Sequence, residues 1–295
     1  MGYGSYSATD WSKLKSSRQL SKTNSVSEVF QRNFCNPKFD PRYIGTRECF
    51  DSDDHPHSTP IVVGLDVTAS MGYLAVKVAT EALNELIMKL YSTGSIEDPS
   101  LMCAAYGDYR DTSPLQVTQF ESDIRIAEQL LELYFENGGQ CNVVPTCLWH
   151  FLANHTNIDA IKKRNQKGFV FTIGDGAEIR KNISPAVTIH QVMGDTSKAT
   201  SPEDVLKEAE KKFHLFHIMI DGDNQYNRQL MNGHAMTIRK ADIDLIPQII
   251  ISTIQLQNGQ QLDAVLEQWD ALERPRLENL LGQLQIRTGN RGFFL

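Results

Sequence analysis

The chain has 295 residues, of which 41% are hydrophobic and 22% charged, an ordinary composition for a globular protein with a sizeable core. Its formal net charge is −7 at pH 7 and no basic stripe is visible, which argues against nucleic acid as the main partner. The five cysteines form no Cys-x-x-Cys pair, so their spacing indicates neither a disulfide framework nor a zinc site. Because no stretch approaches about eighteen consecutive apolar residues and no signal-peptide pattern is visible, we expect a cytoplasmic protein without a membrane partner.

Residues 1–57 are expected to form an N-terminal arm that is partly disordered. The segment from residue 1 to about 25 is rich in Ser, Gly and Lys and carries few apolar residues to bury. Over residues 26–50, aromatic residues recur among prolines and charged residues, which predicts an irregular segment anchored on the domain or, alternatively, a short partner-binding arm.

An apolar run over residues 61–65 ends abruptly at Asp66. Such a β-branched run is typical of a parallel strand covered on both faces, and ligands of open α/β sheets bind beyond the carboxyl ends of such strands. Thr68 and Ser70 follow Asp66 at alternate positions, so one carboxylate and two hydroxyls project from a tight turn. These oxygens suit Mg²⁺ or Mn²⁺. The alternative is a strand that merely ends in a hydrogen-bonded Asp turn.

The next elements predict a strand–helix–strand unit with an edge strand. Apolar residues at helical spacing over 76–90 predict a crossover helix, and residues 101–106 predict a second parallel strand. Asp108 follows this strand, and we expect it to reach the metal site through water or through hydrogen bonds to the ligands. For Asp111, a surface turn with Arg110 is an equal alternative. Alternating residues over 115–120 predict an antiparallel edge strand.

A third parallel strand is expected over residues 168–174, and it ends at Asp175 on the same sheet edge as Asp66. Further elements are expected as follows: a helix over 124–135 capped by Ser122 or Asp123, a helix beginning at 201–204, strands over 213–220 and 235–238, and a helix capped by Asp244. We therefore expect one doubly wound α/β domain over residues 58–257, with a mostly parallel sheet and one antiparallel edge strand. Residues 258–295 are expected to form a helical extension docked on it.

The order of these landmarks resembles a group of bacterial and phage-borne von Willebrand factor A (vWA) domain proteins. The resemblance rests on Asp-Val-Thr-x-Ser-Met-Gly at 66–72, Gly-Asp at 107–108, Pro-Leu-Gln-Val-x-Gln-Phe-Glu-Ser-Asp at 114–123, Gly-Gly at 138–139 and Ile-Gly-Asp at 173–175. It implies a Rossmann-like vWA fold whose metal-ion-dependent adhesion site (MIDAS) holds Mg²⁺ or Mn²⁺. The ligands that it implies are Asp66, Thr68, Ser70, Asp175 and either Thr146 or Asn142. Asp108 would contact these ligands and not the ion itself.

Two positions depart from the pattern of that group. Pro145-Thr146 stands where Glu-Ser is usual, which leaves the choice between Thr146 and Asn142 open. Gly176 stands where an acidic residue is commoner, which removes one negative charge beside the metal.

The resemblance implies a metal-dependent protein–protein interaction module rather than an enzyme. In such a module the metal keeps a position open for a carboxylate of a partner protein, here unidentified, in the assembly of an intracellular complex. The alternative is a Mg²⁺-dependent phosphatase of haloacid-dehalogenase type, which Asp66-x-Thr68 and residues 174–176 resemble. That chemistry needs a second aspartate as general acid two residues after the nucleophile, and Thr68 occupies that position.

Overall fold

The computed structural model describes residues 5–94, 96–136, 143–179 and 183–286. Its main element is a six-stranded sheet in the order β4-β3-β2-β6-β7-β8. All neighbouring strands are parallel except β3 and β4, so the expected doubly wound α/β fold with one antiparallel edge strand is confirmed. The strands are β2 (Thr59–Asp66), β3 (Pro99–Tyr106), β4 (Leu115–Val117), β6 (Gly168–Gly174), β7 (Phe213–Ile220) and β8 (Ala235–Ile238).

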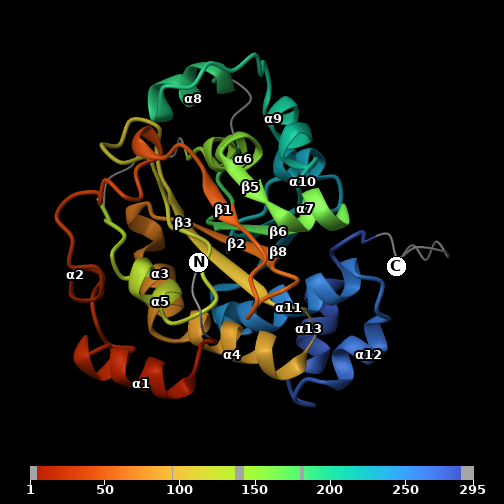
Figure 1. Ribbon diagram of the computed structural model, residues 1–295. Helices are drawn as coiled ribbons and strands as arrows, with labels where there is room; N and C mark the ends of the chain where they lie inside the picture. The colour runs from red at the N-terminus through yellow and green to blue at the C-terminus, as the bar shows by residue number, and fades with distance from the viewer. Residues whose placement is uncertain (1–4, 95, 137–142, 180–182, 287–295) are drawn as a thin grey trace.

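The central strands are buried along their whole length because helices cover both faces of the sheet. Successive residues of β2 point to opposite faces: Ile61 and Val63 join one core cluster and Val62 joins the other. Figure 1 shows α6, α8 and α9 on one side of the sheet and α4 and α11 on the other. The two cores therefore lie on opposite faces of one sheet.

The helices divide between these two faces. The first face carries α1 (Ala8–Ser17), α3 (Gly72–Lys77), α4 (Leu83–Thr93), α5 (Arg125–Leu130), α11 (Ile246–Gln257), α12 (Leu262–Glu267) and α13 (Arg274–Leu281). The second face carries α6 (Pro145–Asn154), α7 (Asp159–Arg164), α8 (Pro185–Met193), α9 (Pro202–Ala209) and α10 (Gln225–Met231). A π-helical turn, Val78–Ala82, joins α3 to α4. In the described part of the chain, none of the helices combines the length and the apolar character that crossing a bilayer requires.

Close packing of α6 on β2 depends on Gly64. A Cβ at this position would lie 2.6 Å from Leu148 Cδ2 of α6, so a larger residue would force the Leu148 side chain to shift. Beyond α6, β5 (Thr156–Ile158) pairs in parallel with β1 (Arg47–Cys49) in a second, two-stranded sheet. The short helices α2 (Val26–Val29) and η1 (Pro41–Tyr43) precede β1.

The N-terminal segment differs from the expected poorly ordered arm. Residues 8–17 form α1, whose first turn is capped by the Ser7 side chain accepting from the Asp10 backbone N–H. Tyr6, Trp11 and Leu20 are buried in the core cluster of the first face. The expectation relied on the small number of apolar residues, whereas these few are large and spaced so that each reaches the core. Residues 1–4 lie outside the described chain.

The C-terminal helices pack against α11. Val265, Trp269 and Leu277 are buried, and Trp269 Nε1 donates a hydrogen bond to Ser252 Oγ of α11 at 2.8 Å. Leu272 is 87% exposed because it lies in the turn between α12 and α13. The division of the chain at residues 57 and 257 stays a prediction.

Two predicted helix boundaries were wrong. Asp244 does not cap α11: it lies inside a 3₁₀ turn, η4 (Lys240–Leu245), and forms an ion pair with Lys77, while α11 begins at Ile246 without a side-chain cap. The helix expected over residues 124–135 is shorter, because α5 ends at Leu130.

Candidate metal site

The structure brings Asp66 and Asp175 to one edge of the sheet. Asp66 is the last residue of β2, Asp175 directly follows β6, and the two strands are hydrogen-bonded neighbours. The loop after Asp66 turns back through a 3₁₀ turn, η2 (Ala69–Met71), into α3. Parallel strands with helical crossovers place their carboxyl ends at a common edge, so the predicted convergence follows from the topology.

Four oxygen-bearing side chains form a continuous chain of contacts at this edge. The Thr68 backbone N–H and hydroxyl both donate to Asp66 Oδ1, at 2.9 and 2.7 Å. Thr68 Oγ1 lies 3.4 Å from Ser70 Oγ, and the Ser70 hydroxyl donates to Asp175 Oδ2 at 3.3 Å. The other Asp175 oxygen accepts from the Ala177 backbone N–H at 3.1 Å. Oxygens of this kind are the ligands that hard divalent cations prefer.

The carboxyl group of Asp66 is poorly compensated. Asp66 is only 2% exposed, and burial raises its pKa to about 7, with the charges of Asp175 and Asp111 adding to the shift and the Thr68 hydrogen bonds opposing it. Among the ion pairs of the described residues, none involves Asp66 or Asp175. A buried carboxylate without a cationic partner is costly, so this donor set fits a bound divalent cation.

A small cavity of about 10 Å³ adjoins the two carboxylates, which is roughly the room that one water molecule needs. Its lining includes Asp66, Tyr106, Val143, Pro145, Gly174, Asp175, Gly176, Ala177, Ile179 and His217. The position of Pro145 in this lining places the start of α6 beside the site.

His217 is a site residue that sequence reasoning missed. Its Nδ1 pairs with Thr172 Oγ1 at 2.9 Å, and its Nε2 is buried without a hydrogen-bond partner among the described residues. Burial lowers the pKa of His217 to about 4, so the ring is neutral near neutral pH. The sequence feature that could have indicated His217 is a titratable residue within the apolar run of β7.

The remaining candidate ligands lie as follows. Thr146 is buried in the first turn of α6, one residue after Pro145. Asn142 lies outside the described residues. Asp108 is buried, and its Oδ1 accepts from the Arg110 backbone N–H and Nε. The charge of Asp111, for which a plain surface turn was an equal alternative, acts on Asp66.

Gly176 is explained by the packing of two loops. Its φ is +78°, a conformation that favours glycine, and a Cβ there would lie 2.8 Å from the backbone oxygen of Gly222. Likewise, a Cβ at Gly222 would lie 2.3 Å from the Asp175 carbonyl oxygen. The loops after β6 and β7 therefore touch backbone to backbone, and an acidic side chain at position 176 would not fit.

No family model matches the chain, and no curated protein matches it in sequence. Its structural neighbours are vWA-domain proteins. The pilus adhesin SpaC from Lactobacillus rhamnosus GG, in its open conformation, is 11% identical, with 73% of this chain and 31% of that chain covered and a TM-score of 0.48.

Two further structures are similar at the same level. The von Willebrand factor type A protein from Catenulispora acidiphila is 12% identical, with 69% and 43% of the two chains covered and a TM-score of 0.42. Proximal thread matrix protein 1 from the mussel byssus, with zinc in its MIDAS motif, is 11% identical, with 66% and 47% covered and a TM-score of 0.43. The chain spans less than half the length of each of these three chains. At such identities, the site must be argued from the geometry of this chain.

Proposed function

We propose that this chain is a divalent-metal-dependent protein–protein interaction module of the vWA type. The observation that carries the proposal is the Asp66 carboxyl group, which is buried and forms no ion pair among the described residues. The side-chain oxygens of Thr68, Ser70 and Asp175 lie next to it in a continuous series of contacts. These four residues would hold Mg²⁺ or Mn²⁺, with either Thr146 or Asn142 as a further ligand and water at the remaining positions. Asp108 would contact the ligands and not the ion. The bound ion would supply an open position for a carboxylate of the partner.

The charge of the site determines how a partner is held. Asp66 and Asp175 together cancel the charge of a divalent ion, so an incoming carboxylate is attracted by the strong local field of the ion in a partly dry crevice. Binding should then depend less on salt than an interface of exposed charges does. We also propose that the module works in the cytoplasm, in the assembly of an intracellular complex.

Capture of the partner tests this function. The immobilised protein, incubated with extract of its native host, should retain a partner in Mg²⁺ and lose it in EDTA. Asp66→Ala and Thr68→Ala should reduce capture at least tenfold while leaving the thermal melt nearly intact. Ser92→Ala, which removes an exposed hydroxyl of α4, is the matched control and should capture normally. We also expect capture to require an Asp or Glu on the partner.

Two outcomes would contradict the function. If capture survives in EDTA, the interface lies elsewhere on the surface. If Asp66→Ala and Thr68→Ala unfold while Ser92→Ala does not, the ion holds the fold together and does not bridge to a partner.

Absence of phosphatase activity is a separate prediction. The Thr68 hydroxyl is hydrogen-bonded to Asp66 and has no acidic proton to give a leaving group, so Asp66 lacks the general acid that a phosphatase needs. The purified protein with Mg²⁺ should hydrolyse p-nitrophenyl phosphate no faster than Asp66→Asn does. Steady turnover that disappears in Asp66→Asn would instead favour the phosphatase alternative.

A further inference from the structure

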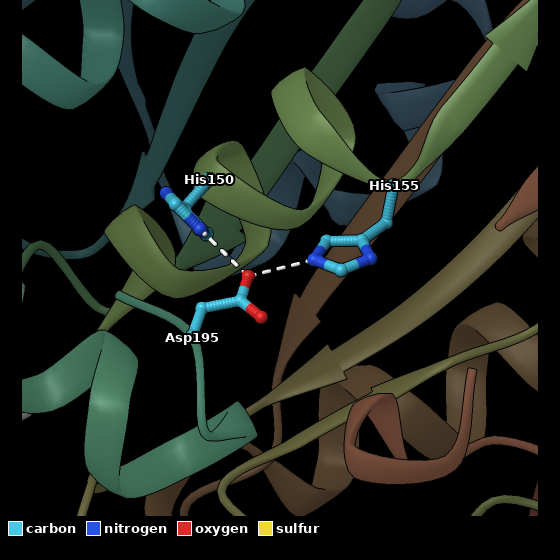
Figure 2. A group of neighbouring side chains, drawn as sticks. All are labelled: His150, His155 and Asp195. Atoms are coloured by element: carbon cyan, nitrogen blue, oxygen red, sulfur yellow. Dashed lines mark hydrogen bonds and ion pairs between the residues drawn. The ribbon is translucent and has the colours of Figure 1, made fainter. Parts of the chain in front are cut away.

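A second cluster of metal-ligating side chains lies at the other end of α6. His150 is in the second half of α6, His155 directly follows the helix, and Asp195 lies in the loop after α8. Figure 2 shows both imidazole rings directed at one carboxylate oxygen: Asp195 Oδ2 is 2.9 Å from His150 Nε2 and 2.6 Å from His155 Nε2. The three atoms lie within 4.8 Å of one another, the one such group found among the described residues.

The hydrogen bonding of His155 leaves its Nε2 facing Asp195 with a lone pair. His155 Nδ1 lies 3.0 Å from the carbonyl oxygen of Gly45, which only accepts, so Nδ1 carries the hydrogen. In a neutral ring, Nε2 then presents a lone pair to a carboxylate oxygen 2.6 Å away. Two lone pairs at this distance repel each other, so the contact requires either an extra proton or a cation between the two atoms.

The surroundings favour a metal ion. A metal-binding histidine usually donates its other N–H to a backbone carbonyl or carboxylate, which is the arrangement of His155 with Gly45. Two imidazole nitrogens and one carboxylate oxygen are a donor set that Zn²⁺ accepts. The side chains of His150, His155 and Asp195 are 10%, 21% and 25% exposed, so solvent reaches the cluster and water can supply a fourth ligand.

Small adjustments would bring the ligands to metal-binding distances. Zinc–ligand distances of about 2.0–2.1 Å in tetrahedral geometry separate ligand atoms by roughly 3.3 Å, so the Asp195 carboxylate must retreat by about half an ångström. The two Nε2 atoms, which lie within 4.8 Å of each other, must come to the same separation. Asp195 follows Gly194, whose φ of +81° ends α8, and the loop after it carries no helix or strand up to residue 201. His150 must present a lone pair at Nε2, so its Nδ1 must carry the hydrogen. The exposed Asn154 amide nitrogen lies 3.3 Å from Nδ1 and donates to the His150 carbonyl at 3.0 Å, so it must then move away from Nδ1 while keeping the carbonyl hydrogen bond.

We propose that His150, His155 and Asp195 form a second divalent-metal site that binds Zn²⁺ with a fourth position open to water. This site is distinct from the Asp66 site because it uses other residues at the opposite end of α6. Zinc there would join the end of α6 to the loop after α8 and, through Gly45, to the segment that precedes β1.

Titration with ZnCl₂ tests the site in the Asp66→Ala background, which removes the proposed Mg²⁺ site. After treatment with EDTA and dialysis, this protein should bind one equivalent of Zn²⁺ and melt at a higher temperature with zinc than without. Asp195→Asn and His155→Ala should each weaken binding at least 100-fold. His57→Ala is the matched control, since it removes an exposed histidine that also pairs with a carboxylate, at 3.1 Å from Glu97, and it should change neither readout.

Each result of this titration decides the proposal. If His155→Ala does not fold, Asp195→Asn carries the test, because its amide keeps the size of the side chain and can still hydrogen-bond. Absence of a zinc equivalent in the Asp66→Ala background, or unchanged affinity in Asp195→Asn, would overturn the site and leave Asp195 as a hydrogen-bond partner of the two histidines. If the proposed metal site at Asp66 is wrong, the wild-type protein will not bind Mg²⁺, and that result is independent of the zinc titration.

Discussion

Asp66→Ala should abolish Mg²⁺ binding, with a loss of affinity of at least 100-fold and no measurable heat in a calorimetric titration. Asp66 provides the one carboxylate in the buried half of the site, and its Oδ1 also orients Thr68 through two hydrogen bonds. Removal of the side chain therefore takes away a ligand and releases the hydroxyl that follows it. Neutral hydroxyls bind Mg²⁺ weakly without an anionic partner.

Asp111→Ala is the matched control for this experiment. Asp111 acts on Asp66 by its charge and accepts a hydrogen bond from the Asp108 backbone N–H, but it is not among the proposed ligands. Its removal should change Mg²⁺ affinity less than tenfold. Equal losses in the two variants would show that the ion responds to the negative potential of the region and not to the ligand set.

A change in the pH dependence of stability is expected when His217 is replaced. The pKa of His217 is about 4 in the folded chain, compared with 6.5 for an ordinary histidine, because burial disfavours the charged ring. Between pH 4 and 6.5 the unfolded chain holds a proton at this position and the folded chain does not, so stability rises with pH. The whole contribution amounts to about 3 kcal/mol, or about 1.4 kcal/mol per pH unit.

The Asp66 carboxyl group contributes to the pH dependence of stability with the opposite sign. Its pKa of about 7 in the folded chain lies above the ordinary value of 3.8, so between these values the folded chain holds a proton that the unfolded chain has lost. Without metal, this contribution makes stability fall as pH rises through that range, by about 4 kcal/mol in total. The two buried groups therefore act against each other over most of the interval from pH 4 to 7.

Urea unfolding in EDTA from pH 4.5 to 6.5 measures both contributions. Compared with wild type, His217→Asn should show a stability that falls more, or rises less, with increasing pH, by about 2 kcal/mol over the interval. Asp66→Asn should shift the slope in the opposite direction. His190→Asn, the same substitution at an exposed position of α8, should follow the wild-type curve. Parallel curves for wild type and His217→Asn would contradict the expected proton linkage.

The strands were the most predictable part of the fold. The apolar runs over residues 213–220 and 235–238 match β7 and β8 residue for residue, because buried parallel strands consist of continuous β-branched and aromatic residues. The convergence of Asp66 and Asp175 followed from the right-handed topology alone. The helix α1 was missed because its stability comes from Trp11, which reaches a distant core, and not from its own periodicity.

Two groups of polar residues were not predictable from sequence patterns. The functional interest of His217 depends on the cavity that it lines, and this cavity exists only once β7 and α6 are packed. His150 and His155 are five positions apart, a spacing that does not share one helical face, and they meet only because His155 lies beyond the end of α6. Asp195 joins them from a loop that is 40 residues further along the chain than His155.

The helix α6 begins beside one proposed ion site, with Pro145 in the cavity lining, and ends at the other, with His150 and His155. At about 1.5 Å per residue, its ten residues span roughly 15 Å. Salt screens charges in open solvent, but it screens partly buried charges much less, so two bound ions would still repel each other through the protein. This repulsion, or a displacement of α6 against β2, would couple the two sites. Thermodynamic reciprocity then requires that zinc change the magnesium affinity by the same factor by which magnesium changes the zinc affinity.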